Sequence, residues 1–193
     1  MIRQAHEHLS GIIRSMELFR TVIDKAETVF DDKGGFPAHY VGSGKYKPIN
    51  LQSDAGVSYI RQNGHIEIEN SGIEPRSMGE TYKLVTLPLK LVFCIDKEAV
   101  EGDSAYSSGL LFATLMKKIT QSGPLLRKNI GAEKTLFDVI SYEDRRDVVL
   151  TEEFPGSEVK DLLARYTLAS MEIKVRTDIS LSCLEELCNE EQY

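Results

Sequence analysis

The stretch Gly42-Ser43-Gly44-Lys45 comes closest to a known chemical motif, because glycines followed by a lysine are typical of loops that hold phosphate. A Walker loop also needs a glycine five residues before the second glycine and a serine or threonine after the lysine, and it opens a helix. His39 and Tyr46 occupy those two positions, and Pro48 stands where the helix should begin. We therefore expect a flexible hairpin loop here and no nucleotide site.

Histidines and paired glutamates are the next candidates, for metal binding and for acid–base catalysis. His6 and His8 lie about 200° apart on a helix, so they cannot share a metal there, and we expect both on a solvated surface. His65, Glu67 and Glu69 share one face of a strand. A metal would need further ligands, and acid–base work would need one carboxylate to be buried. We expect these three residues to form a solvated strand face.

The remaining nucleophiles and acids lack a catalytic spacing. Ser107-Ser108-Gly109 does not fit the Gly-x-Ser-x-Gly pattern of a nucleophile elbow. The three cysteines form neither a C-x-x-C pair nor a zinc pattern, which favours a reduced, intracellular setting. Cys94 ends an apolar stretch and is expected to be a small core residue. The other cysteines are Cys183 and Cys188, and the acids expected to be turn charges are Asp138, Glu143, Asp144 and Asp147.

Four tyrosines and three nearby cations could form a stacking surface for single-stranded nucleic acid. Core or interface tyrosines are the commoner arrangement. The chain also has a formal net charge of −7, without a cluster of Lys and Arg that would displace counterions from phosphates. The sequence therefore assigns no catalytic, cofactor-binding or metal-binding residue, and no cofactor. The tyrosines are Tyr40, Tyr46, Tyr59 and Tyr82, and the cations are Lys45, Lys47 and Arg61.

Length and composition fit one α+β domain over residues 1–193. The chain is 41% hydrophobic and 27% charged, as in an ordinary soluble globular protein. No apolar run approaches the roughly 18 residues of a membrane span, and the first residues lack the hydrophobic segment of a signal peptide. We expect neither membrane insertion nor secretion.

Apolar residues repeat every three to four positions from Ala5 to Phe30, and they predict a helix of about seven turns within residues 1–33. Residues 36–80 are expected to form a hairpin and loop region. In it, Gln62-Asn63-Gly64 should be the turn of a hairpin, since Asn-Gly is the strongest short-range hairpin signal. The strands expected in this region are 36–41, 57–61 and 65–69.

Residues 81–193 are expected to form the core of a mixed, largely antiparallel sheet with a second helix packed on it. The run 82–95 is almost continuously apolar, which predicts a strand buried on both faces, and Pro88 predicts a bulge or an unpaired edge within it. The other elements expected are a helix at 104–119 capped by Asp103 or Ser104, strands at 136–143 and 148–154, a helical turn at 159–163 and a short helix at 184–188.

The stretch 166–181 alternates with period two, which is typical of a half-buried strand. Apolar residues such as Ile173 should face the core, and charged residues such as Lys174 should face outward. We expect this strand to complete the sheet beside 82–95.

This order of elements resembles the tail-terminator and head–tail completion (neck) proteins of tailed bacteriophages. The resemblance lies in the strand Leu84-Val85-Thr86-Leu87-Pro88-Leu89-Lys90-Leu91-Val92-Phe93, the helix through Leu110-Leu111-Phe112-Ala113-Thr114-Leu115, and the final strand Met171-Glu172-Ile173-Lys174-Val175. Members of that family are α/β proteins that assemble as rings, typically hexameric, which cap the tail tube and join it to the head.

The resemblance implies a structural assembly protein without catalysis, a homo-oligomeric ring, and tail-tube or neck proteins as partners. DNA would pass through such a ring without specific binding, and the protein would be found in the bacterial cytoplasm or in the virion tail. Two alternatives stay open from the sequence. One is an enzyme acting on a small molecule or nucleotide, with a site built from residues distant in sequence. The other is a monomeric partner-binding module.

Overall fold

An eight-stranded, mostly antiparallel sheet organises the part of the chain that the computed structural model describes, which is residues 1–74, 80–96, 108–156 and 166–183. Seven strands follow the order β3-β2-β1-β4-β6-β8-β7, and β5 pairs with β6 beside this path. The strands are β1 (Thr21–Asp31), β2 (Gly34–Gly42), β3 (Lys45–Pro48), β4 (Gly56–Gln62), β5 (Glu67–Asn70), β6 (Tyr82–Asp96), β7 (Lys134–Glu143) and β8 (Tyr166–Ser180). The expected α+β class with a mixed sheet and an N-terminal helix is confirmed.

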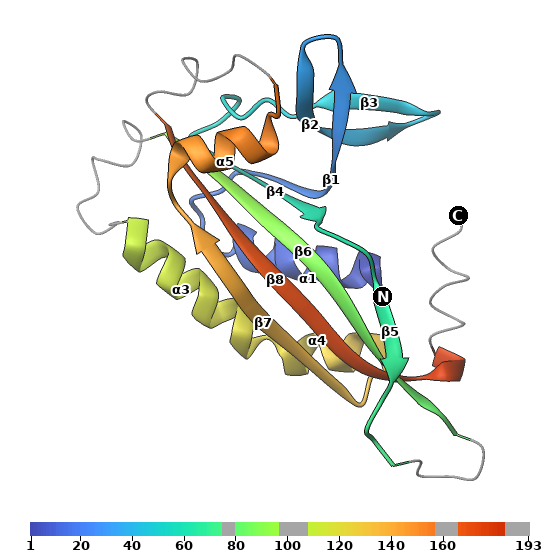
Figure 1. The fold of residues 1–193 in the computed structure, drawn as a ribbon. Coiled ribbons are helices and arrows are strands. Elements are labelled where there is room, and N and C mark those ends of the chain that lie inside the picture. The colour runs from blue at the N-terminus through green and yellow to red at the C-terminus, as the bar shows by residue number, and fades with distance from the viewer. Residues whose placement is uncertain (75–79, 97–107, 157–165, 184–193) are drawn as a thin grey trace.

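The two longest strands, β6 and β8, lie side by side at the centre of the sheet (Figure 1) and pair antiparallel over their full lengths, from Tyr82↔Ser180 to Asp96↔Tyr166. Ile173 is buried and Lys174 is exposed, as the alternation of β8 predicts. Toward its N-terminal end β8 is buried on both faces, because a helix covers the second face there. The predicted pairing of these two strands is confirmed.

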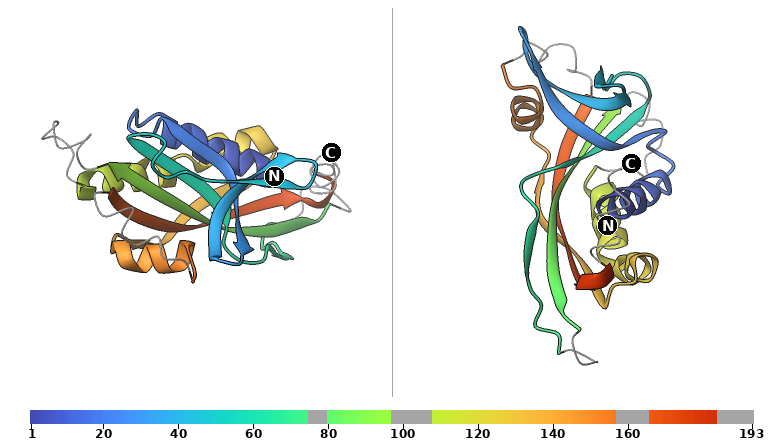
Figure 2. Two further views of the ribbon diagram at one scale, coloured as in Figure 1. Left: turned by 90° about the horizontal axis from the view of Figure 1, so that it is seen from above. Right: turned by 90° about the vertical axis from the view of Figure 1, so that its right-hand side faces the viewer.

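Helices cover the two faces of the sheet unequally, as Figure 2 shows from above. One face carries α1 (Ile2–Arg14), α3 (Ser108–Gln121) and α4 (Gly123–Ile130), which bury the larger apolar cluster against the inward residues of β6 and β8. Among the described helices, α5 (Arg146–Glu153) alone covers the other face. It packs over a smaller apolar cluster that includes Val92 and Leu168. The strand ends far from α5 therefore present polar side chains on this face.

The C-terminal half of β1 leaves the main sheet and builds an arm with β2 and β3 at one end of the molecule (Figure 1). β1 pairs parallel with β4 as far as Ala26 and antiparallel with β2 from Ala26 onward. A register shift between Ile23 and Ala26 places one extra residue on β1 at this junction. Such a bulge bends a strand and increases its twist, which redirects β1 from the sheet into the arm.

The predicted N-terminal helix is present but half as long as expected. It ends at Arg14, and the chain then turns through Glu17, whose φ of 59° lies in the left-handed region that ends helices. Residues 21–31 are a strand instead of the second half of the helix. The β-branched residues Thr21, Val22 and Ile23 favour a strand, and the bulge places apolar side chains at spacings that imitate a helical repeat.

The predicted hairpin around Gln62-Asn63-Gly64 is wrong. β4 and β5 do not pair with each other but lie one after the other along the same edge of β6. Pro88 lies opposite the break between them, where Asn63 N–H donates to the Pro88 carbonyl at 3.0 Å. The N–H and C=O of one strand residue point to the same side, so the missing donor of Pro88 faces this break. The interruption predicted at Pro88 is confirmed.

The strand predicted at 148–154 is wrong as well, because α5 occupies these residues. Val149, Leu150 and Glu153 are its buried positions, a helical spacing that includes a charged residue. The strands predicted at 36–41, 57–61, 82–95 and 136–143 are confirmed as β2, β4, β6 and β7, and the helix predicted at 104–119 is confirmed over α3. The cap at Asp103 or Ser104, the turn at 159–163 and the helix at 184–188 lie outside the described residues.

Candidate functional site

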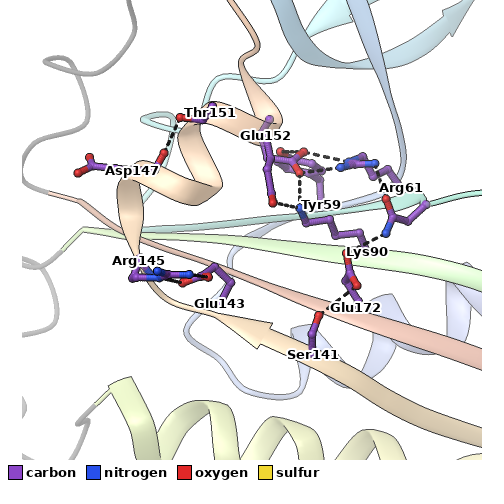
Figure 3. A network of polar contacts seen from close by, with 12 residues as sticks. Tyr59, Arg61, Lys90, Ser141, Glu143, Arg145, Asp147, Thr151, Glu152 and Glu172 are labelled. Carbon is purple, nitrogen blue, oxygen red and sulfur yellow. Dashed lines mark hydrogen bonds and ion pairs between the residues drawn. The ribbon is translucent and has the colours of Figure 1, made fainter.

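A buried polar network joins α5 to the face of the sheet that α5 covers (Figure 3). The side chain of Glu153 is fully buried. Its carboxylate accepts hydrogen bonds from the Tyr59 hydroxyl at 2.7 Å and from two nitrogens of Arg61, Nε at 3.0 Å and Nη2 at 2.8 Å. The residues come from β4 and from the last position of α5, so this contact fixes the end of the helix on the sheet.

Lys90 brings a second cation into the network from β6. It is 3% exposed, and its ammonium lies 3.0 Å from Glu153 Oε1 and 2.5 Å from Glu152 Oε2. Arg61 and Lys90 thus face two carboxylates, and the charges balance. A buried cation without such partners would be strongly destabilising, so this pairing is what allows a buried lysine between the apolar residues Leu89 and Leu91.

A chain of hydrogen bonds carries the network across the sheet. Arg61 Nη1 donates to Asn63 Oδ1 at 3.2 Å, and Asn63 Nδ2 donates to Glu172 Oε1 at 3.0 Å. Ser141 Oγ donates to the other oxygen of Glu172 at 3.1 Å. Four strands and one helix are therefore linked through side chains. Such a network favours one arrangement of the sheet, because any shift of register would leave buried charges unpaired.

Proton affinities in the network are set by burial and by these contacts. Burial opposes ionisation of Glu153, but the hydrogen bonds and charge of Arg61, with Lys90 and Tyr59, outweigh it and lower the pKa of the carboxyl. Burial, together with the charge and hydrogen bond of Glu153, raises the pKa of the Tyr59 hydroxyl well above its ordinary value. At neutral pH the network holds an ionised carboxylate beside a protonated phenol. This charged, hydrogen-bonded network therefore anchors the end of α5 to the sheet.

The anchor reaches the arm through the residues that follow α5. Gly35 N–H, in β2, donates to the carbonyl oxygen of Pro155 at 2.8 Å. A Cβ on Gly35 would lie 2.7 Å from Cγ of Pro155, so any other residue here would force Pro155 to move away. The network at Glu153 therefore helps to hold the arm at a defined angle to the sheet.

The arm presents large apolar side chains to solvent. Phe30, Tyr40, Val41 and Tyr46 are between 41% and 68% exposed. The rings of Tyr40 and Tyr46 lie 5.4 Å apart, and the Tyr46 hydroxyl donates to Glu27 at 2.9 Å. Tyr40 also accepts a hydrogen bond from the Gly44 amide at 3.1 Å, which ties the hairpin loop to the strand before it. One ring contact and two hydrogen bonds therefore hold Tyr40 and Tyr46 against the arm.

The histidines and glutamates considered from the sequence as metal ligands or acid–base groups do not come together in one site. His6 is buried, and its Nδ1 donates to the Asp24 carbonyl, so the solvated position predicted for it is wrong. His8 is half-buried and stacks on Phe137 at 5.7 Å, and burial lowers its pKa despite a hydrogen bond to the Ser122 backbone. The solvent-exposed position predicted for His8 is therefore also wrong.

The predicted strand face at residues 65–69 is only partly present. Glu67 and Glu69 share a face of β5 and are exposed, as predicted, whereas His65 lies before the strand begins. The loop at 42–45 is the turn between β2 and β3, so the predicted hairpin loop is confirmed. His39 lies half-buried on β2.

Tyrosines fall into two groups and do not form one stacking surface. Tyr59 and Tyr82 are buried, while Tyr40 and Tyr46 are exposed on the arm. Arg61 is held by Glu153. Cys94 is a buried core residue, as predicted, and burial raises the pKa of its thiol to about 12. The turn position predicted for four acids is wrong for Asp138, which lies within β7, and for Asp147, which lies within α5, whereas Glu143 ends β7 and Asp144 lies between the two elements. Asp138 pairs with Arg176 at 2.5 Å, and Glu143 pairs with Arg145 at 2.6 Å. Cys188 lies outside the described residues.

Sequence reasoning missed Glu153 and Lys90. One signal was present, because Lys90 interrupts a run of apolar residues predicted to be buried on both faces. Such a lysine needs a buried anion as partner. No pattern points to Glu153, which lies 92 positions from Arg61 in the chain.

A scan against models of known protein families found no match, and neither did a search of curated proteins. Within the described ranges, no group of three His, Cys, Asp or Glu side chains could hold a metal ion. No described helix is both long and apolar enough to cross a membrane.

Proposed function

We propose that this protein is a non-enzymatic structural assembly protein whose copies form a ring, as a tail-terminator or neck component of a tailed phage or prophage. Its partners would be further copies of itself and the tail-tube or neck proteins next to the ring. It would act in the cytoplasm of a bacterial host or in the virion tail.

The observation that carries the proposal is the arm. Phe30, Tyr40, Val41 and Tyr46 are exposed on an extension that is held in place by α5 and by the Gly35–Pro155 contact. Large apolar side chains that are exposed on a protruding element are available for contact with another protein surface. A braced extension can reach a neighbouring subunit, and a contact between two different surfaces of the same chain closes into a ring when the rotation between copies allows it.

Charge and element order add support. The formal net charge of −7 suits a passage through which DNA slides, since a basic wall would retain phosphates. The long strand β6, the helix α3 and the closing strand β8 follow one another as in the phage family that the sequence resembles. A monomeric partner-binding module would use the same arm, and the mass of the protein in solution separates these two functions.

The experiment is sedimentation velocity of the wild-type protein over a wide concentration range, compared with two arm variants, Tyr40→Ala and Val41→Ser. We expect a closed oligomer for the wild type and weaker assembly for both variants with unchanged monomer folding. Leu125→Ser is the matched control for Val41→Ser, because Leu125 is an exposed aliphatic residue on α4, away from the arm. A wild-type protein that stays monomeric throughout would contradict the proposal.

A further inference from the structure

Two short edge strands, β3 and β5, have matching shapes and opposite charges. β3 begins Lys45-Tyr46-Lys47 and β5 begins Glu67-Ile68-Glu69, and every residue of both strands is exposed. Among the described strands, each is hydrogen-bonded to one neighbour, β3 to β2 and β5 to β6. Each strand alternates two like charges with one large apolar side chain.

The four charged side chains of these strands have no ion-pair partner within the part of the chain that the structure describes. The apolar residue between each pair is also exposed, Ile68 to 55% and Tyr46 to 41%. Both the charges and the apolar groups are therefore accessible to another protein surface.

The free backbone groups of the two strands fall on their central residues. Ile49 N–H donates to Pro37 in β2, and Ser71 N–H donates to Tyr82 in β6. Backbone groups of successive strand residues point to opposite sides. Counting back from these two bonds, Tyr46 and Ile68 direct their N–H and C=O to the free edge. Pro48 also faces that edge, where its missing donor breaks no existing pair.

We propose that β3 of one copy pairs with β5 of a second copy, extending the sheet from one subunit to the next. Tyr46 and Ile68 would lie opposite each other and exchange backbone hydrogen bonds. Their side chains would then meet on one face, and two Lys–Glu pairs would form on the other. The two strands would run antiparallel, because only antiparallel strands place two residues opposite each other that exchange both backbone hydrogen bonds.

The two strands cannot pair within one chain. β3 lies in the arm at one end of the molecule, and β5 lies toward the opposite end of the long sheet (Figures 1 and 2). The contact is therefore head-to-tail between copies, which is the arrangement that rings require. This inference rests on the proposed function, because it names the surfaces through which the ring subunits would meet.

Charge reversal on each strand, followed by mixing, tests the pairing. Lys45→Glu/Lys47→Glu and Glu67→Lys/Glu69→Lys each place like charges opposite each other in every contact between identical copies. We expect each variant alone to associate about tenfold more weakly than wild type, or worse. An equimolar mixture of the two restores opposite charges at every contact, and its association should return to within about threefold of wild type.

Lys117→Glu/Lys128→Glu is the matched control for Lys45→Glu/Lys47→Glu, because it makes the same charge change on exposed positions of α3 and α4. It should associate as wild type does. All the substituted side chains are exposed, so we expect every variant to fold as wild type does. Circular dichroism checks this. Sedimentation velocity gives the association constants.

The outcomes separate the pairing from the proposed function. A wild-type protein that assembles, with reversed variants that assemble equally well, would overturn the pairing and leave the assembly function standing. Variants that weaken assembly but show no recovery on mixing would also overturn it. A wild-type protein that is monomeric at every concentration would overturn both.

Discussion

Replacing Glu153 with glutamine changes one buried group without changing its shape, which makes it a sharp test of the network under α5. Oε1 of the carboxylate accepts a hydrogen bond from Arg61 and forms an ion pair with Lys90, and Oε2 accepts hydrogen bonds from Arg61 and Tyr59. The amide group of glutamine must direct an NH2 at one of these two pairs of donors, whichever way it turns. Two of the four contacts then become repulsive, and the balancing negative charge is lost.

The expected cost follows from these contacts. A hydrogen bond to a charged group is worth about 1.5–3 kcal/mol, and breaking a buried ion pair on one side costs about 3–5 kcal/mol. We expect Glu153→Gln to lower the free energy of unfolding by about 3–5 kcal/mol. That is a large part of the roughly 5–15 kcal/mol that stabilises a typical domain.

The neighbouring residue provides the control. Glu152 contacts the same Lys90 ammonium at 2.5 Å but is 48% exposed, so Glu152→Gln should cost no more than about 1 kcal/mol. Urea unfolding followed by circular dichroism, at concentrations where all proteins are monomeric, measures both values. Equal losses for the two variants, or a Glu153→Gln protein as stable as wild type, would refute the anchoring role.

Three further predictions concern the core and its pH dependence. Ile173→Asp, which places a charge at a position that is 1% exposed, should cost more than about 4 kcal/mol in urea unfolding, and a fully folded variant would show that the inward face of β8 is misassigned. Gly123→Ala should lower the free energy of unfolding by about 2 kcal/mol, because the new Cβ would lie 2.4 Å from the Thr135 carbonyl oxygen. In the control Gly11→Ala the new Cβ has open space around it, so the free energy of unfolding should stay the same or rise by up to about 1 kcal/mol. Burial lowers the pKa of His8 in the fold, so as pH falls below the ordinary histidine pKa of about 6.5 the unfolded chain binds a proton before the folded protein does. The free energy of unfolding should therefore decline as pH falls from 7 to 5. A His8→Gln protein should lose the part of this pH dependence that His8 contributes.

The central strands could be predicted from the sequence because their patterns depend on burial alone. β8 alternates where one face is covered, and β6 has an unbroken apolar run, residues 91–95, where both faces are covered. Residues 21–31 misled the prediction because the bulge between Ile23 and Ala26 breaks the period of two. Local pattern cannot distinguish a bulged strand from a helix when the extra residue restores a spacing of three or four.

The candidate site was less predictable, for a different physical reason. The turn predicted at Asn63-Gly64 has the right local chemistry, but the pairing of β4 and β5 with β6 decides the path of the chain. Glu153 and Arg61 meet only after α5 packs on the sheet, and α5 itself was predicted as a strand. A buried network of residues from distant segments leaves little trace in local sequence, apart from the lysine within β6.

The exposed residues of the arm could be located in part. Tyr40 was expected to be a core or interface tyrosine, and it is exposed on β2. Tyr59 was grouped with it, but Tyr59 is fully buried and bonded to Glu153. Tyr59→Ala should therefore impair monomer folding, whereas Tyr40→Ala should not. The sequence does not separate the two tyrosines, since both lie in strands rich in apolar residues.

The mass of the wild-type protein in solution, measured by sedimentation velocity from dilute to concentrated samples, tests the central claim most directly. Self-assembly through the arm predicts a closed oligomer of defined size, typically six copies if the phage resemblance holds, that Tyr40→Ala weakens while the monomer remains folded. A wild-type protein with the mass of one chain at every concentration would contradict the account.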